Sequence, residues 1–243
     1  MCSIFILCYN EEILLPHTIN HYKTNIPNCK ITILDNKSTD NSQNIAKSMD
    51  CNIIEWSSDR WEGIDDFKYK DLKNNCWKDA EDGWIIVCDM DEWLCITEKE
   101  LEEEKQNGTT ILDIKGFEIL GTSTRINLTD INLHELNRGY FNNLESKKLC
   151  FLKNEIKEMN YTIGAHKCKP IGNIKYSKKK YYNKHLNYLG ENYYIDKILK
   201  RNERAKNQHM NKPKLGGHYI DKEIIIKRRY MGSLKKSFIF NFE

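Results

Sequence analysis

Hydrophobic and polar positions in the first hundred residues follow two alternating patterns. Short apolar runs without a helical period predict buried strands at residues 3–8, 30–34, 52–56 and 83–88. Between these runs, apolar residues at helical spacing predict helices at residues 13–22, from Asp40 to Ser48, and at residues 65–79. Because strands and helices alternate, this part of the chain predicts an α/β fold with a mostly parallel central sheet flanked by helices.

The second half of the chain has a less regular pattern. Strands are predicted at residues 110–116, 117–120, 149–152 and 160–163, and a helix at residues 191–207. Gly216 and Gly217 break the pattern before a basic tail. No linker rich in Pro, Gly or Ser divides the chain, and no internal repeat is present. We therefore expect a single domain over residues 1–220 with an elaborated C-terminal half, followed by the tail at residues 221–243.

The overall composition is that of a globular protein. Of the 243 residues, 40% are apolar and 30% are charged, which excludes a disordered chain. The net charge is only +3, so the protein as a whole is not a strong polyanion binder. The run Lys178-Lys179-Lys180 precedes two tyrosines, a pattern that nucleic-acid binders also use, but such runs are usually solvated loops. We expect no nucleic-acid partner.

The pattern of cysteines and the lengths of the apolar runs indicate where in the cell the protein is expected. The nine cysteines have no disulfide-like spacing, and no signal-like segment precedes the first predicted strand, which favours free thiols in a reducing compartment. No apolar run approaches the ~20 residues needed to span a bilayer. These features predict a soluble cytoplasmic protein. The more basic C-terminal third leaves peripheral membrane contact open.

Polar clusters follow three of the predicted strands, at the point where each strand ends. They are Tyr9-Asn10-Glu11, Asp35-Asn36 and Asp89-Met90-Asp91-Glu92. In an open parallel sheet, ligands bind beyond the carboxyl ends of the strands. The topology therefore predicts that these distant clusters meet at one edge of the sheet.

Asp89 and Asp91 stand two residues apart after a buried strand. Paired carboxylates suit Mg²⁺ or Mn²⁺, and such an ion neutralises the charge that develops on a departing diphosphate. A solvated turn is the competing interpretation, because short acidic motifs are common. The position directly after the predicted strand favours a site.

Other candidate residues also have purely structural interpretations. Asp35 could accept a hydrogen bond from a nucleotide base or could organise its own loop as an Asx-turn, and both roles are compatible. Lys73 could meet a diphosphate, although residue type alone favours a solvated helix face. His166 or His185 could complete a metal site, whereas a lone histidine is more often structural. Zinc at His166 and nearby cysteines lacks a supporting C-x-x-C pair.

Motifs of several other enzyme classes are absent from the sequence. It contains no G-x-x-x-x-G-K-[ST] loop and no G-x-G-x-x-G fingerprint, so a P-loop or a dinucleotide-binding Rossmann protein loses its main support. It also contains no G-x-S-x-G elbow, which an α/β-hydrolase would need.

Four motifs in order resemble the family-two glycosyltransferases of the GT-A fold. The similarity is greatest to a branch with a YNEE start, a DNxSTD loop and a DxDE motif. In this chain the motifs are residues 8–12, residues 34–40, residues 73–77 and residues 87–92. Residues 160–168 and 185–190 also resemble that branch, so the likeness covers roughly residues 3 to 220.

The resemblance implies a nucleotide-sugar-binding half at residues 1–95 and an acceptor half at residues 96–220. Asp35 matches the aspartate that recognises the donor base, and Lys73 stands where an arginine is usual. The implied donor-binding residues are Tyr9, Asn10, Glu11, Asp35, Lys73, Asn74 and Met90. The implied ligands of Mn²⁺ or Mg²⁺ are Asp89 and Asp91, joined by His185 as first choice or His166 as second.

The resemblance leaves the general base unassigned. No Glu-Asp pair follows Asp91, and Glu118 and Glu191 are the remaining candidates. We expect a metal-dependent glycosyltransferase that uses a nucleotide-diphosphate sugar, of UDP type, and inverts the sugar on an acceptor hydroxyl. The acceptor would be a glycan, a lipid-linked molecule or a protein. The alternatives are an inactive sugar-nucleotide or glycan-binding module, and a metal-dependent phosphoesterase or nucleotidyltransferase. The sequence does not indicate the oligomeric state.

Overall fold

The computed structural model describes residues 1–57, 65–209 and 222–240. The chain divides into two compact units, each described here by itself. The first comprises Met1–Ser57, Phe67–Phe117 and Asn142–His185, and the second comprises the described parts of Ser58–Asp66, Glu118–Phe141 and Leu186–Glu243. The units interleave along the chain, whereas the expected halves are consecutive. The expected boundary between residues 220 and 221, and the break at Gly216 and Gly217, lie outside the described residues.

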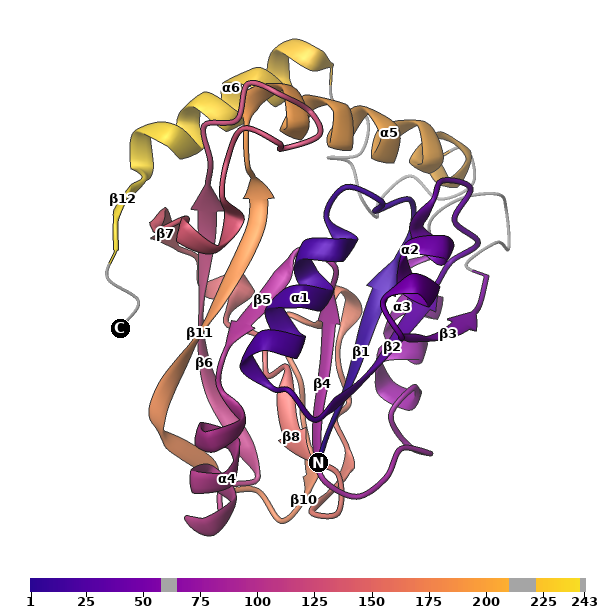
Figure 1. Cartoon of the computed structure of the whole chain (residues 1–243), viewed down its shortest axis with the longest axis vertical. Coiled ribbons are helices and arrows are strands. Elements are labelled where there is room, and N and C mark those ends of the chain that lie inside the picture. The colour runs from indigo at the N-terminus through magenta and orange to yellow at the C-terminus, as the bar shows by residue number, and fades with distance from the viewer. Residues whose placement is uncertain (58–64, 210–221, 241–243) are drawn as a thin grey trace. The chain divides into compact units, whose positions relative to one another are not determined.

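Four parallel strands form the centre of the first unit, and Figure 1 shows them side by side. Their spatial order is β3 (Asn52–Glu55), β2 (Cys29–Asp35), β1 (Cys2–Cys8) and β4 (Trp84–Asp89). All seven residues of β1 are buried, as expected for a parallel strand covered on both faces. The helices between the strands are α1 (Leu15–Asn25), α2 (Ser42–Ser48) and α3 (Asp66–Asn75). The predicted α/β class with a mostly parallel central sheet is therefore confirmed.

Antiparallel strands extend this sheet beyond β4. Strand β8 (Cys150–Leu152) pairs with β4, and β6 (Ile111–Leu120) follows it. Two residues separate β4 from strand β5 (Glu92–Cys95), and β5 pairs with β11 (Tyr176–Tyr188). Helix α4 (Glu98–Gln106) follows β5, and β9 (Ile156–Glu158) with β10 (Ile171–Gly172) forms a separate pair. Two single-turn 3₁₀ helices, η2 (Asn143–Glu145) and η3 (Ile163–Ala165), lie between these strands.

Aromatic and aliphatic side chains from distant segments fill the core of the first unit. Phe5 and Val87 from the parallel strands belong to the same buried cluster as Trp77 and Phe151. The rings of Trp77 and Phe151 meet edge to face with centroids 4.8 Å apart. Because Phe151 comes from β8, this contact joins the antiparallel extension to the parallel strands and their helices.

The second unit contains two helices that pack on each other. They are α5 (Glu191–His209) and α6 (Glu223–Lys236), and Tyr194, Ile198, Ile226 and Tyr230 form their buried cluster. Strand β7 (Arg138–Phe141), preceded by η1 (Leu133–Glu135), pairs with β12 (Phe238–Ile239). Among the described residues, no helix is both long and apolar enough to cross a membrane.

Two sequence predictions of strands need correction. Residues 110–116 and 117–120 were expected as separate strands but form the single strand β6, because Gly116 continues the strand and lets the backbone of Glu145 approach closely. Residues 160–163 form no strand. Their apolar side chain Tyr161 is buried in irregular backbone, where Asn160 and Gly164 adopt positive φ angles.

A capping box at the start of α4 provides a test of local stability. The Glu100 side chain accepts hydrogen bonds from Thr97 at 2.9 Å and contacts Lys179 at 2.5 Å. Burial raises the pKa of Glu100, but Lys179 and the Thr97 donors outweigh it, and the pKa falls below its ordinary value of 4.5. A lowered pKa stabilises the fold above about pH 4.5, and this contribution disappears as the pH falls through the folded-state pKa.

We expect Glu100→Gln to lower the free energy of unfolding by about 1 kcal/mol at pH 7, because the variant loses the negative charge. Glutamine can still cap the helix, so the difference reports the charge rather than the cap. Urea denaturation from pH 7 to pH 3 measures the difference, which should shrink below about pH 4.5. Glu102→Gln on the exposed side of the same helix is the control. A pH-independent difference between the Glu100 variant and the wild type would contradict the linkage.

Candidate functional site

The carboxyl ends of the parallel strands bring the predicted polar clusters to one edge of the sheet. In the strand register, Cys8 at the end of β1 lies opposite Asp35 at the end of β2. On the other side of β1, Leu7 lies opposite Asp89 at the end of β4. Three segments that are far apart in sequence therefore meet, as the predicted topology requires.

The loops after β1 and β2 are joined by hydrogen bonds. The Asn10 side-chain oxygen accepts from the Thr39 backbone N–H at 2.7 Å, and the Asn10 N–H donates to the Ser38 hydroxyl at 2.9 Å. The Glu11 N–H donates to Ser42 at 2.9 Å. Asn10 has a φ of 54°, a conformation that asparagine tolerates better than most residues. This loop pair presents an ordered polar surface beside Tyr9.

Asp35 organises the loop that follows it. One carboxylate oxygen, Oδ2, accepts from the Ser38 N–H at 3.0 Å and from the Gln43 side chain at 2.8 Å. The other oxygen, Oδ1, is buried and has no hydrogen-bond partner among the described residues. The Asx-turn role considered from the sequence is therefore present, and one acceptor oxygen is left over.

A tight turn connects β4 to β5 and carries the paired aspartates. Asp89 is the last residue of β4, and Glu92 is the first residue of β5. The fully buried Glu92 side chain folds back and accepts a hydrogen bond from the Asp89 backbone N–H at 2.8 Å. This contact keeps both residues of the turn in a defined position.

Helix α1 holds the same turn from the other side through two buried hydroxyls. Thr18 donates to the Met90 carbonyl at 2.9 Å. Tyr22 donates to the Glu92 carbonyl at 2.9 Å and accepts from the Leu94 N–H at 3.2 Å. The turn therefore has fixed backbone positions on both sides of Asp91.

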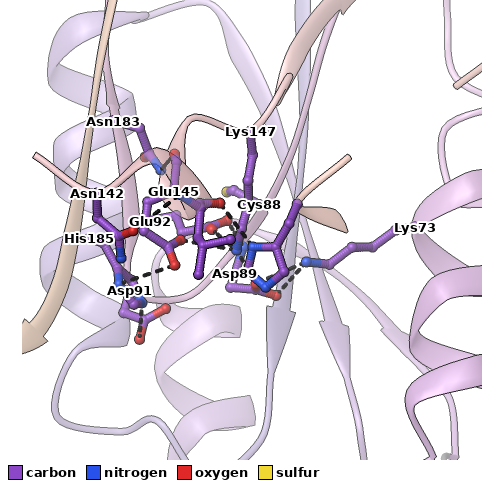
Figure 2. A network of polar contacts seen from close by, with 12 residues as sticks. Lys73, Cys88, Asp89, Asp91, Glu92, Asn142, Glu145, Lys147, Asn183 and His185 are labelled. Atoms are coloured by element: carbon purple, nitrogen blue, oxygen red, sulfur yellow. Dashed lines mark hydrogen bonds and ion pairs between the residues drawn. The ribbon is translucent and has the colours of Figure 1, made fainter. Parts of the chain in front are cut away.

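Two buried lysines contact the carboxylates of the turn (Figure 2). The Lys73 ammonium, from α3, lies 2.8 Å from Asp89 Oδ1. The Lys147 ammonium lies 2.5 Å from Glu92, 3.2 Å from Glu145 and 3.6 Å from Asp89. We call these five residues the lysine–carboxylate cluster. It links α3, the β4–β5 turn and the segment after η2.

Opposing effects set the charge states in this cluster. Burial raises the pKa of Asp89, but Lys73 and Lys147 outweigh it and lower the pKa to about 2. Burial likewise raises the pKa of Glu145, whereas His185 and Lys147 lower it below its ordinary value. Burial lowers the pKa of Lys147, yet the surrounding carboxylates raise it well above its ordinary value. Asp89 and Glu145 are therefore ionised and Lys147 is protonated at neutral pH.

Burial has the opposite net result at Glu92. It raises the pKa of this carboxyl, and the nearby Lys147 ammonium only partly offsets the effect. The same ammonium therefore stabilises the charge of Asp89 and Glu145 while Glu92 retains a raised pKa.

Asp91 and His185 meet beside the lysine–carboxylate cluster. Strand β11 pairs with β5 so that His185 lies opposite Glu92. His185 Nε2 is 3.3 Å from Asp91 Oδ2, and His185 Nδ1 is 3.9 Å from Glu145 Oε1. In Figure 2, Asp91 and His185 lie on the left and Lys73 lies on the right of Asp89. The histidine that the sequence ranks first thus contacts the predicted acidic motif.

A divalent cation fits the Asp91–His185 pair. Two neighbouring ligands of an octahedral Mg²⁺-sized ion, each about 2.1 Å from it, are separated by about 3 Å, close to the 3.3 Å observed. Glu145 next to Nδ1 suits the carboxylate that commonly orients a metal-bound imidazole. The group contains four carboxylates, at Asp89, Asp91, Glu92 and Glu145, but only two lysines. An excess of oxygen ligands suits a divalent ion.

Other predicted site residues have partners elsewhere. His166 is exposed, and its Nδ1 lies 2.9 Å from the Leu144 carbonyl. Both ends of the Asn74 side-chain amide contact the Tyr161 backbone, at 3.2 Å and 2.7 Å. Asn74 therefore anchors the irregular segment around Tyr161 to α3. Its donor-binding role stays a prediction, as does the metal-binding role of His166.

The two candidate bases belong to the second unit. Glu118 lies on β6 and is buried, and Glu191 is the first residue of α5 and is half-buried.

Sequence patterns did not indicate several residues of the site. Glu145 and Lys147 lie in a short irregular segment, where no periodicity distinguishes a buried charge from a solvated one. Asn183 is fully buried and donates to the Glu145 carbonyl at 3.2 Å. Thr18 and Tyr22 did carry a signal, because their spacing of four residues places two hydroxyl groups on the buried face of a predicted helix.

Comparison with known proteins gives one family match and one curated relative. Residues 3–103 match the model of glycosyl transferase family 2. A stretch of 45 residues is 42% identical to the protein RfbJ of Shigella flexneri. This stretch makes up 18% of this chain and 35% of that protein. The chain thus matches only about a third of the length of this relative.

Solved structures also resemble the chain at low sequence identity. S. aureus TarS 1-349 in complex with UDP-GlcNAc is 14% identical, with a TM-score of 0.43 and coverage of 95% of this chain and 71% of that one. Glucosyl-3-phosphoglycerate synthase from Mycobacterium tuberculosis, in complex with Mn²⁺ and UDP among others, is 12% identical, with a TM-score of 0.33 and coverage of 48% and 44%.

The hydroxyl of Tyr22 offers a test of how α1 holds the turn. We expect Tyr22→Phe to lower the free energy of unfolding by about 1–3 kcal/mol, because the Glu92 carbonyl and the Leu94 N–H lose a buried partner. Urea denaturation measures this loss. Tyr176→Phe, at a tyrosine that is 45% exposed, is the matched control and should change stability by less than about 0.5 kcal/mol. Equal stability of the two variants would contradict the proposed anchor.

Proposed function

We propose that the chain, whose residues 3–103 match the model of glycosyl transferase family 2, is a metal-dependent, inverting glycosyltransferase. It would transfer a sugar from a UDP-type nucleotide-diphosphate donor to an acceptor hydroxyl. The observation that carries the proposal is the Asp91–His185 pair beside the lysine–carboxylate cluster, at the carboxyl ends of the parallel strands. The acceptor is a glycan, a lipid-linked molecule or a protein.

Asp91 and His185 would hold Mn²⁺ or Mg²⁺ together with Asp89, the first carboxylate of the motif. When bound, the ion neutralises the negative charge that develops on the leaving diphosphate. Asp89 is ionised at neutral pH, and 36% of its side chain is exposed, so it remains accessible although both lysines contact it. Glu145 would fix the orientation of the His185 ring.

The remaining residues of the edge would bind the donor. Lys73 reaches the edge from α3, and its amino group suits a diphosphate oxygen. The leftover oxygen of Asp35 is an acceptor that suits the N–H of a uracil ring once the loop opens to admit it. Tyr9, Asn10 and Glu11 lie on the loop joined to that of Asp35 and would line the nucleoside.

A carboxylate must take the proton of the acceptor hydroxyl in an inverting transfer. Glu118 and Glu191 remain the candidates, and the burial of Glu118 on a strand suits a residue that is held in one orientation. A reducing, cytoplasmic location is supported by the cysteines, all nine of which are free thiols.

The metal site is tested with Asp91→Asn. We expect this variant to lose the rise in melting temperature that UDP causes in the presence of Mn²⁺, because the ion that bridges protein and diphosphate loses a ligand. Sugar transfer, or hydrolysis of the donor by water, should fall by at least about a hundredfold. Asp82→Asn, at a carboxylate with a side chain 75% exposed, should leave both unchanged.

Full activity and full Mn²⁺-dependent stabilisation in Asp91→Asn would show that the metal lies elsewhere. No stabilisation of the wild type by any nucleoside diphosphate, in a folded sample, would contradict the proposed donor class.

The general base is tested by comparing Glu118→Gln with Glu191→Gln. We expect one of them to reduce kcat by about 10²–10⁴-fold while the affinity for donor stays unchanged, because the lost group acts only on the acceptor proton. Transfer assays with saturating donor, together with thermal shift by UDP, separate the two effects.

If neither glutamate affects kcat, the base is another group. A wild-type protein that binds the donor with Mn²⁺ but neither transfers nor hydrolyses it would instead be a sugar-nucleotide-binding module.

A further inference from the structure

Helix α6 of the second unit has one buried face and one exposed face. Ile226, Tyr230 and Ser233 are buried, and the first two belong to the cluster that packs on α5, which runs alongside α6 in Figure 1. On the opposite face, Ile224 is 58% exposed and Met231 is 44% exposed. These large apolar side chains do not contribute to the core of the unit.

Basic residues share the exposed face of α6 with these apolar residues. Ile224, Arg228, Met231 and Lys235 are spaced by four, three and four residues, which places them in one row along a helix. Arg228 and Lys235 are both exposed. The row therefore alternates apolar and positively charged side chains.

Further exposed apolar residues lie at the start of α6 and in β12. Phe238 and Ile239 of β12 are 55% and 74% exposed, and Ile225 is exposed at the start of the helix. We call the exposed side chains of α6 and β12 the α6–β12 face. Its large exposed apolar residues are Ile224, Ile225, Met231, Phe238 and Ile239.

The charge of this segment is strongly positive. Residues 222–240 contain six lysines and arginines and a single acidic residue, Glu223. Glu223 is itself paired with Lys227 at 2.9 Å. A positive field therefore surrounds the exposed apolar side chains, although the whole chain has a net charge of only +3.

From this combination we infer that the α6–β12 face docks on an anionic membrane surface. An anionic bilayer offers negative headgroups for the lysines and arginines, and an apolar interior for the exposed isoleucines, methionine and phenylalanine. A second copy of the chain would present the same positive charge and be repelled. A soluble polyanion would satisfy the charges but leave the apolar side chains in water.

The dimensions of α6 indicate how it would lie. Its 14 residues span about 21 Å, which is shorter than the ~30 Å thickness of the hydrocarbon core of a bilayer. The helix would therefore lie in the plane of the interface, with Ile224 and Met231 directed into the lipid and Arg228 and Lys235 at the headgroups. This inference goes beyond the proposed function, because it requires neither donor nor metal.

Vesicle co-sedimentation of the 243-residue chain tests the inference without sugar transfer. We expect the protein to bind vesicles of phosphatidylcholine mixed with phosphatidylglycerol and to remain in solution with phosphatidylcholine alone. Arg228→Gln with Lys235→Gln should weaken binding about thirtyfold, the equivalent of about 1 kcal/mol for each charge. Ile224→Ser with Met231→Ser should weaken it at least about tenfold, because the apolar side chains no longer enter the lipid.

Matched control variants carry substitutions of the same kind at exposed residues of the first unit. They are Lys115→Gln with Lys178→Gln, at two exposed lysines, and Ile171→Ser, at an isoleucine that is 54% exposed. These controls should bind as the wild type does, and thermal melting should show every variant folded.

Three results would overturn the inference. One is equal binding of the wild type to neutral and anionic vesicles, and another is binding that the control variants weaken as much as the α6 variants. The third is loss of binding in the charge variant only, with the apolar variant unaffected, which would indicate a simple polyanion site.

Discussion

The buried ammonium of Lys147 lies among the carboxylates of Asp89, Glu92 and Glu145, and the rest of the site depends on this charge balance. Glu92 and Glu145 are buried, and three carboxylates so close together would repel one another strongly without a cation. Removing one partner of such a group leaves uncompensated buried charge, which typically costs about 3–5 kcal/mol. The β4–β5 turn and the segment after η2 are therefore held together by electrostatics as much as by packing.

Around this cluster, different residues support the turn and provide the candidate metal ligands. Hydroxyl groups of α1 hold the backbone of the turn, and Lys73 with Lys147 hold Asp89. Asp91 and His185 extend from this rigid support, one from the turn and the other from β11. A site on fixed strands loses little conformational freedom when it binds an ion or a diphosphate, which favours the binding proposed for it.

The second unit has a different physical character. Its helices bury one face against each other through tyrosine and isoleucine side chains, but α6 leaves apolar and basic residues on the outside. Water solvates the charged side chains of such a surface, but its apolar side chains stay in unfavourable contact with water. A membrane surface would place the enzyme next to lipid-linked acceptors, one of the acceptor classes proposed for it, and would raise their local concentration.

The sequence by itself determined the parallel α/β sheet, because short apolar runs and helical periodicity are local properties, and the ends of parallel strands then had to share one edge. It also identified the paired aspartates and ranked His185 before His166. Tertiary structure alone decided that Lys147 and Glu145 lie together at the site and that residues 160–163 are irregular although a strand was expected there. It also decided that α6 exposes Ile224 and Met231. The reason is that burial of a charge, or exposure of an apolar group, depends on neighbours from distant segments, which no local period encodes.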